Sequence, residues 1–116
     1  MLTKLLTLIS VTFTCKGFHR YPDAPEDVAY LKLEHRHLFK FKVSIEVFSD
    51  NRELEFHQFL NWLESVVGTT ISVDHKSCEM ISDDLAKTIA DKYPGRHLSI
   101  EVWEDGECGS ITSYKT

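Results

Sequence analysis

Three histidines have side chains and a spacing that could bind a metal ion. His19 is followed by fifteen intervening residues and then by the H-x-H motif of His35 and His37. Neutral imidazoles are common zinc ligands, and three of them leave one position of a tetrahedral Zn²⁺ open, as in a catalytic rather than a structural zinc site. The alternative is that an H-x-H pair simply belongs to a surface or a core.

The strand that contains the H-x-H motif determines where these side chains face. Within Phe39–Val47 every odd position is apolar and every even position is polar, a period of two that indicates a half-buried strand. His35 and His37 share the apolar parity, so both imidazoles are expected on the buried face. His19 has the apolar parity of the preceding strand, although Gly17 could introduce a bulge there.

A carboxylate continues another apolar pattern near the end of the chain. Leu98, Ile100 and Val102 alternate along an expected strand, and Glu104 takes the next position on the same face. Burying an unpaired charge costs several kcal/mol. Glu104 therefore either binds a partner or lies at the strand end and reaches solvent.

Composition limits the class of partner. The chain has 116 residues, 42% of them hydrophobic, and a formal net charge of -5. This length and composition predict one globular domain over residues 1–116. A net negative charge argues against nucleic acid, because phosphate binding needs clustered Lys and Arg. Small molecules or proteins are the expected partners.

The cysteines and the N-terminal residues bear on location. Cys15, Cys78 and Cys108 form no C-x-x-C pair, and an odd number of cysteines favours a reducing, cytoplasmic compartment. An alternative is that Lys4 and the apolar residues after it form a short leader. Threonines and serines interrupt that run, which is also too short and too polar to span a bilayer. No membrane association is expected.

The expected elements form an α+β domain. Period-two runs predict strands, and apolar residues at spacings of three and four predict two helices. In order, they are a strand over 1–19, a loop over 20–30, a strand over 33–47, a helix over 55–68, a connection over 69–76 with a brief β-like run, a helix over 78–93, and strands over 97–104 and 110–115. This ββααββ order predicts an antiparallel four-stranded sheet with two helices on one face.

The order and residues of these segments resemble the 6-pyruvoyl- and 6-carboxytetrahydropterin synthases, whose ββααββ unit is called the T-fold or tunnelling fold. The resemblance covers nearly the whole chain. It rests on five segments: Phe18-His19-Arg20, His35-Arg36-His37, Leu54-Glu55-Phe56, Met80-Ile81-Ser82-Asp83-Asp84-Leu85-Ala86 and Val102-Trp103-Glu104. No single segment is diagnostic, and their order and spacing carry the resemblance.

This resemblance implies a ligand set and an assembly. It implies zinc at His19, His35 and His37. It implies that Glu104 accepts two N–H bonds from the 2-aminopyrimidinone edge of a pterin or a guanine-like base. It also implies a homo-oligomeric barrel, a trimer or a hexamer of two trimers, with ligand sites between subunits.

One departure from the family bears on catalysis. Members that act on the side chain of 7,8-dihydroneopterin triphosphate place a Cys or a Glu four residues before the H-x-H, where this chain has Leu31. Leucine can neither take nor give a proton, so the usual general base is missing. Asp74-His75 resembles the catalytic Asp-His pair of the family, although the loop after it is shorter. Cys78 could approach the site from a helix start.

The resemblance and its departure predict a function. The protein is expected to bind a pterin- or purine-type small molecule or nucleotide in an inter-subunit pocket, without standard synthase chemistry. The alternative is an active zinc-dependent 6-carboxy- or 6-pyruvoyltetrahydropterin synthase-like enzyme acting on 7,8-dihydroneopterin triphosphate. In that alternative Asp74, His75 and Cys78 replace the missing base.

Overall fold

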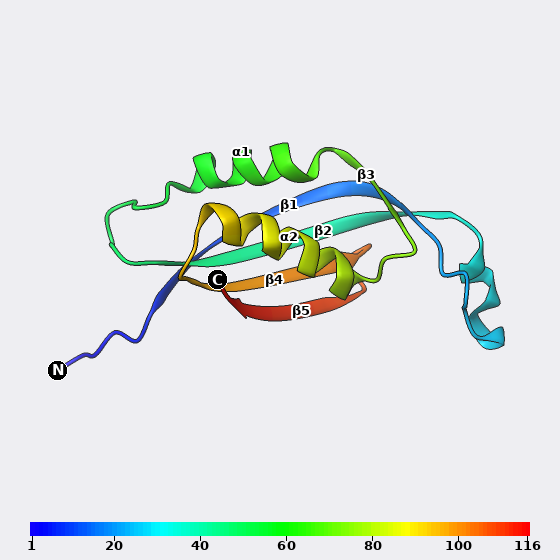
Figure 1. Ribbon diagram of the computed structural model, residues 1–116, viewed down its shortest axis with the longest axis horizontal. Coiled ribbons are helices and arrows are strands. Elements are labelled where there is room, and N and C mark those ends of the chain that lie inside the picture. The colour runs from blue at the N-terminus through cyan, green and yellow to red at the C-terminus, as the bar shows by residue number, and fades with distance from the viewer.

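The structure is a computed structural model that describes all 116 residues. Two long paired strands form its centre (Figure 1). The α+β class is confirmed. In chain order the elements are β1 (Thr7–His19), the 3-10 helix η1 (Glu26–Lys32), β2 (His35–Val47), α1 (Phe56–Val67), β3 (Thr70–Asp74), α2 (Cys78–Lys92), β4 (His97–Glu104) and β5 (Cys108–Lys115).

The sheet has five strands, so the expectation of four was wrong. Its order is β3-β1-β2-β4-β5, and β3 runs parallel to β1 while the other pairs are antiparallel. The brief β-like run within 69–76 forms the strand β3 because it pairs with the free edge of β1. In this pairing Lys16 lies opposite Thr70, and Gly17 lies opposite Ile71. The prediction of a purely antiparallel sheet fails for the same reason.

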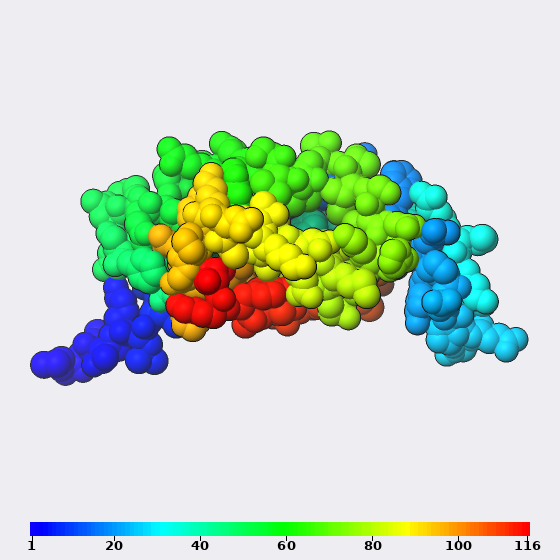
Figure 2. Space-filling view, in the orientation of Figure 1, coloured from blue at the N-terminus to red at the C-terminus, as the bar shows by residue number.

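Several expected boundaries also differ. The second strand begins at His35 rather than at 33, α1 covers Phe56–Val67 rather than 55–68, and α2 ends at Lys92 rather than at 93. The first strand begins at Thr7 rather than at residue 1, and the residues before it are exposed. Part of the loop expected over 20–30 forms η1, which begins directly after Pro25, whose fixed φ of -57° suits the start of a helical turn. The last strand begins at Cys108 rather than at 110. Figure 2 shows that the N-terminal residues and the segment around η1 project from opposite ends of the molecule.

Gly17 introduces no bulge into the central pairing, a possibility that the sequence left open. The β1–β2 register is continuous from Thr7 opposite Val47 to His19 opposite His35. An irregularity occurs instead between β1 and β3, at Phe18 and His19. Gly17 serves a different purpose, because a Cβ built on it would lie 2.3 Å from Cε2 of Phe39. The missing side chain leaves room for that buried ring.

Both helices cover one face of the sheet, as expected. Glu55 caps α1 by accepting from the backbone N–H of Gln58 (2.8 Å), and Ser77 caps α2 by accepting from Met80 N–H (3.2 Å). Alternate residues of the strands meet the apolar stripes of the helices in one core. Its fully buried large side chains are Phe39, Phe41, Val43, Ile45, Phe59, Leu63, Ile89, Leu98, Ile100 and Val102. No helix is both long enough and apolar enough to cross a membrane.

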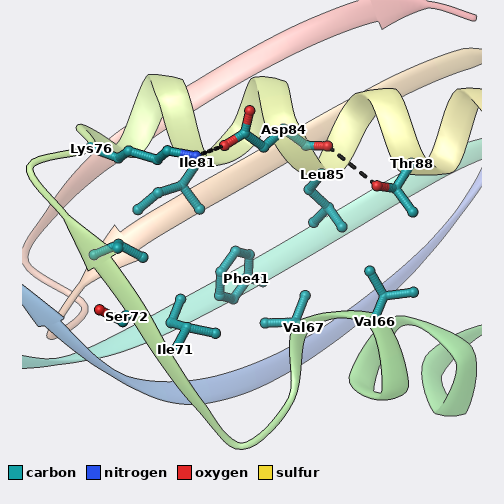
Figure 3. A pocket seen from close by; sticks show the side chains of 11 residues that line it. Phe41, Val66, Val67, Ile71, Ser72, Lys76, Ile81, Asp84, Leu85 and Thr88 are labelled. Carbon is teal, nitrogen blue, oxygen red and sulfur yellow. Dashed lines mark hydrogen bonds and ion pairs between the residues drawn. The ribbon is translucent and has the colours of Figure 1, made fainter.

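A small gap remains between the two helices above Phe41 (Figure 3). Its volume is about 250 Å³, and its walls are largely apolar. The polar feature at its rim is an ion pair of Lys76 with Asp84, whose backbone oxygen accepts from the hydroxyl of Thr88 (3.5 Å). This gap offers van der Waals contact and little chemistry, whereas the titratable groups of interest lie at one end of the sheet.

Candidate functional site

The three expected metal ligands meet at one end of the β1–β2 pair. His19 and His35 are register partners on adjacent strands, and His37 is two residues further along β2 on the same face. One ligand atom from each histidine lies within 4.8 Å of the others. The pairing register therefore brings together residues that are sixteen and eighteen positions apart in sequence.

The distances within this cluster suit a small cation. Nδ1 of His19 is 3.3 Å from Nε2 of His35. Two nitrogens that bind one tetrahedral zinc at about 2.0–2.1 Å are about 3.3–3.4 Å apart. In the metal-free chain the same separation lets the Nδ1–H of His19 donate to Nε2 of His35, so this distance is compatible with both states.

The hydrogen bonds of His35 and His37 leave the required lone pairs free. Nδ1 of His35 donates to the backbone oxygen of Leu33 (2.8 Å), and Nδ1 of His37 donates to Oδ2 of Asp105 (2.7 Å). Each neutral ring then keeps an acceptor lone pair at Nε2. Nε2 of His37 is buried and has no hydrogen-bond partner. A buried acceptor without a partner is what a metal ligand requires, so the three side chains fit such an ion.

Asp105 is the residue of this site that sequence analysis missed. It lies in the β4–β5 turn with φ +55° and accepts from Leu38 N–H through Oδ1 (2.8 Å) and from His37 through Oδ2. The hydrogen bond from Leu38 N–H is the main cause of the lowered pKa of the Asp105 carboxyl, and the hydrogen bond from His37 lowers this pKa further. In the sequence, Asp105-Gly106 indicates only a turn, so no local pattern points to this contact.

Glu104 lies where its parity predicted, on the core face and half-buried. Its Oε2 is 3.6 Å from Nε2 of His37, too far for a hydrogen bond, and its Oε1 is 3.8 Å from Sγ of Cys78. The carboxylate borders a cavity of about 550 Å³. This cavity meets the histidine cluster at His19, while His35 and His37 lie outside its wall.

Burial sets the chemistry of the groups around this cavity. Burial, and next the negative charge of Glu104, raise the pKa of the Cys78 thiol to about 12. Cys78 is therefore a neutral thiol at neutral pH and donates weakly to Glu104. Burial also lowers the pKa of His19, and the charge of Glu104 partly opposes this effect. A neutral imidazole is the form that binds metal.

Asp74 and His75 are close to the cavity in different ways. His75 lines the cavity wall, and its Nδ1 donates to Oδ2 of Asp74 (3.2 Å). The other carboxylate oxygen of Asp74 accepts from Nε of Arg20 (2.6 Å), and this hydrogen bond is the main cause of the lowered pKa of Asp74. The pair therefore has the geometry of a base and the carboxylate that orients it.

Leu31 does not reach this site. It lies in η1, and its backbone oxygen accepts from Tyr21 N–H (2.7 Å), while its side chain is absent from the cavity wall. The position at which the tetrahydropterin synthases carry a proton-transfer group is therefore apolar here, and its side chain does not line the cavity that Glu104 borders. The thiol that does line the cavity is that of Cys78, at the start of α2.

Comparison with known proteins does not assign a family. No protein-family model matches the chain, and no curated protein matches it either.

Proposed function

We propose that this chain is a divergent T-fold protein, similar to the 6-pyruvoyl- and 6-carboxytetrahydropterin synthases, that binds a pterin- or purine-type (guanine-like) small molecule or nucleotide. In this proposal Glu104 holds the base, His19, His35 and His37 hold zinc, and the bound molecule is kept or sequestered rather than converted. The chain acts as a homo-oligomer, a trimer or a hexamer, with the pocket between subunits.

The main observation behind this proposal is that the carboxylate of Glu104 has few hydrogen-bond partners within the chain. Its carboxylate is half-buried beside a cavity, yet its one side-chain hydrogen bond is the weak contact from the Cys78 thiol at 3.8 Å. A desolvated carboxylate favours two strong donors. The ring N–H and 2-amino group of a pterin or a guanine present two parallel donors at one edge, and they would satisfy both oxygens.

The histidine cluster supports zinc beside that base. The unpartnered Nε2 of His37 and the short separation between His19 and His35 suit a cation with nitrogen ligands. Zinc held by these histidines would supply a Lewis acid next to the pocket. The neutral thiol of Cys78 and the position of Leu31 away from the cavity favour binding over synthase chemistry.

The contact between His75 and Asp74 beside the cavity supports a second candidate function, that of an enzyme. His75 lines the cavity, and Asp74 holds its Nδ1, so its Nε2 is free to accept a proton. With Cys78 on the same wall, these residues could replace the missing base in a zinc-dependent synthase-like lyase acting on 7,8-dihydroneopterin triphosphate.

The role of Glu104 is tested by ligand binding. We expect Glu104→Gln to weaken binding of guanine and of pterins by roughly tenfold or more, because the amide replaces one acceptor with a donor that faces the donors of the base. Isothermal titration of guanine, pterin, GMP and GTP would measure this loss. Glu79→Gln makes the same change of charge elsewhere on the cavity wall and should have little effect. Equal affinity of the wild type and Glu104→Gln for every compound would show the assignment to be wrong.

Turnover separates the two functions. Purified protein is incubated with 7,8-dihydroneopterin triphosphate and zinc, and the products are followed by mass spectrometry. The binding proposal expects unchanged substrate. Product formation that is lost in both His35→Ala and His75→Ala would instead establish the enzyme.

A further inference from the structure

The β4–β5 turn holds Asp105 in one orientation against the end of β2. Its backbone N–H donates to the Leu38 oxygen (2.8 Å), and Leu38 N–H donates to its Oδ1 (2.8 Å). These two contacts fix the carboxylate, so that Oδ2 meets Nδ1 of His37 at 2.7 Å. The φ of +55° at Asp105 is a conformation that Asp and Asn tolerate better than most side chains.

This contact decides which nitrogen of His37 carries the proton. An ionised carboxylate can only accept hydrogen bonds, so Nδ1 is the donor, and in the neutral ring Nε2 keeps its lone pair. Nε2 is buried, and it lacks any donor that would use the lone pair. Histidine ligands to metals commonly depend on such an outer carboxylate for their tautomer and ring orientation.

We infer that Asp105 is a positioning residue that locks His37 in the Nδ1–H tautomer and thereby directs its Nε2 lone pair into the three-histidine cluster. The inference rests on the metal centre of the proposed function and adds to it an outer carboxylate from the β4–β5 turn. Asp105 is not one of the residues whose ligand atoms converge, which are the three histidines alone, and its oxygens accept from Leu38 and His37.

The substitution Asp105→Asn tests this role selectively. One end of the asparagine amide is a donor, and it must face either Leu38 N–H or Nδ1 of His37. The proton of Leu38 N–H cannot move, whereas His37 can shift its proton to Nε2. The amide oxygen therefore stays with Leu38, and His37 changes tautomer, which removes the lone pair from the cluster.

The substitution Asp105→Gly is the matched comparison. Glycine accepts the positive φ and removes both side-chain hydrogen bonds, so His37 is no longer held in either tautomer. A purely structural role predicts that Gly is worse than Asn, because Gly loses the Leu38 contact as well. A positioning role predicts the reverse order for metal binding.

The first measurement is the His37 tautomer in metal-free protein, by long-range ¹H–¹⁵N correlation spectra at pH 8. We expect a protonated Nδ1 in the wild type and a protonated Nε2 in Asp105→Asn. Circular dichroism and thermal unfolding check that each variant is folded. Asp91→Asn, an exposed change of the same charge on α2, should retain the wild-type tautomer.

The second measurement is zinc affinity by competition with a chelator, with cobalt(II) absorption spectra as a report of ligand geometry. We expect Asp105→Asn to weaken zinc binding by about 10–100-fold. Asp105→Gly should weaken it less, and Asp91→Asn should leave it unchanged. The tetrahedral cobalt bands should lose intensity in Asp105→Asn.

The outcomes separate this inference from the proposed metal centre. A His37 tautomer that is the same in the wild type and in folded Asp105→Asn overturns the inference, as does a changed tautomer with unchanged zinc affinity. A wild-type chain with Nδ1–H at His37 but no zinc binding overturns the proposed metal centre and leaves only the tautomer assignment standing. A greater loss of affinity in Gly than in Asn shows that Asp105 only shapes the turn.

Discussion

The surroundings of Cys78 make it a poor nucleophile, although it lines the cavity. The side chain is 8% exposed, and its Sγ lies 3.8 Å from a carboxylate oxygen of Glu104. Both desolvation and the neighbouring negative charge disfavour the thiolate. A thiol in this position can donate a hydrogen bond to Glu104 but does not attack carbon at neutral pH.

This environment predicts slow alkylation. With a pKa of about 12 instead of the ordinary 9.0, the thiolate fraction of Cys78 at pH 7.5 is about a thousandfold lower than that of an ordinary cysteine. We expect iodoacetamide to label the exposed Cys108 first and Cys78 only slowly, with the Cys78 rate rising as the pH approaches 10. Peptide mapping by mass spectrometry measures both rates in one sample. Equal rates at pH 7.5 would contradict the assigned environment.

Residue parity predicted the faces of His35, His37 and Glu104, because the alternation of side chains in a strand is a local property. The convergence of His19 with His35 needed the pairing register as well, which depends on two strands at once. The role of Asp105 was not predictable, because it depends on where one turn lies relative to the end of another strand.

At the scale of elements, the two helices were predictable and the fifth strand was not. Phe59 and Leu63 of α1 and the stripe of α2 repeat at the helical period within a single segment. The β3 pattern is only Ile71-Ser72-Val73, and its pairing with Lys16 and Gly17 spans more than fifty residues. Such a short run forms a strand because β1 offers an unpaired edge. The residues of the run do not indicate that this edge exists.

The close packing of Gly17 against Phe39 predicts a costly substitution. In Gly17→Ala the new methyl group would lie 2.3 Å and 2.5 Å from ring atoms of Phe39, which is fully buried and cannot move freely. We expect a loss of unfolding free energy of about 1–3 kcal/mol, measured by urea denaturation. Thr14→Ala, at an exposed position of the same strand, should change the free energy by less than about 0.5 kcal/mol. A stable Gly17→Ala variant would mean that the ring has another place to pack.

At the scale of the whole molecule, the sheet has two free edges and one open face. The two helices lie on the core side, and β3 and β5 each have one unpaired edge. Leu8, Leu38 and Ile111 are 41%, 47% and 64% exposed. Exposed edges and apolar side chains on a sheet favour association with other chains.

We therefore expect native mass spectrometry to detect a trimer or a hexamer at micromolar concentration. Ile111→Lys places a charge on the β5 edge strand and should shift the population toward smaller species, without a large fall in the melting temperature of the monomer. A chain that stays monomeric at all concentrations would contradict the proposed assembly and the inter-subunit pocket.

The segment between β1 and β2 leaves the sheet at His19 and returns at His35, two residues that face each other across the pair. A metal ion held by both would act as a crosslink at the base of this fifteen-residue excursion. Because its ligands converge only in the native chain, the ion would stabilise the native state by mass action. The metal concentration would then determine how firmly η1 and its flanking residues are held. One ion would contribute both to ligand binding in the pocket and to the stability of that end of the molecule.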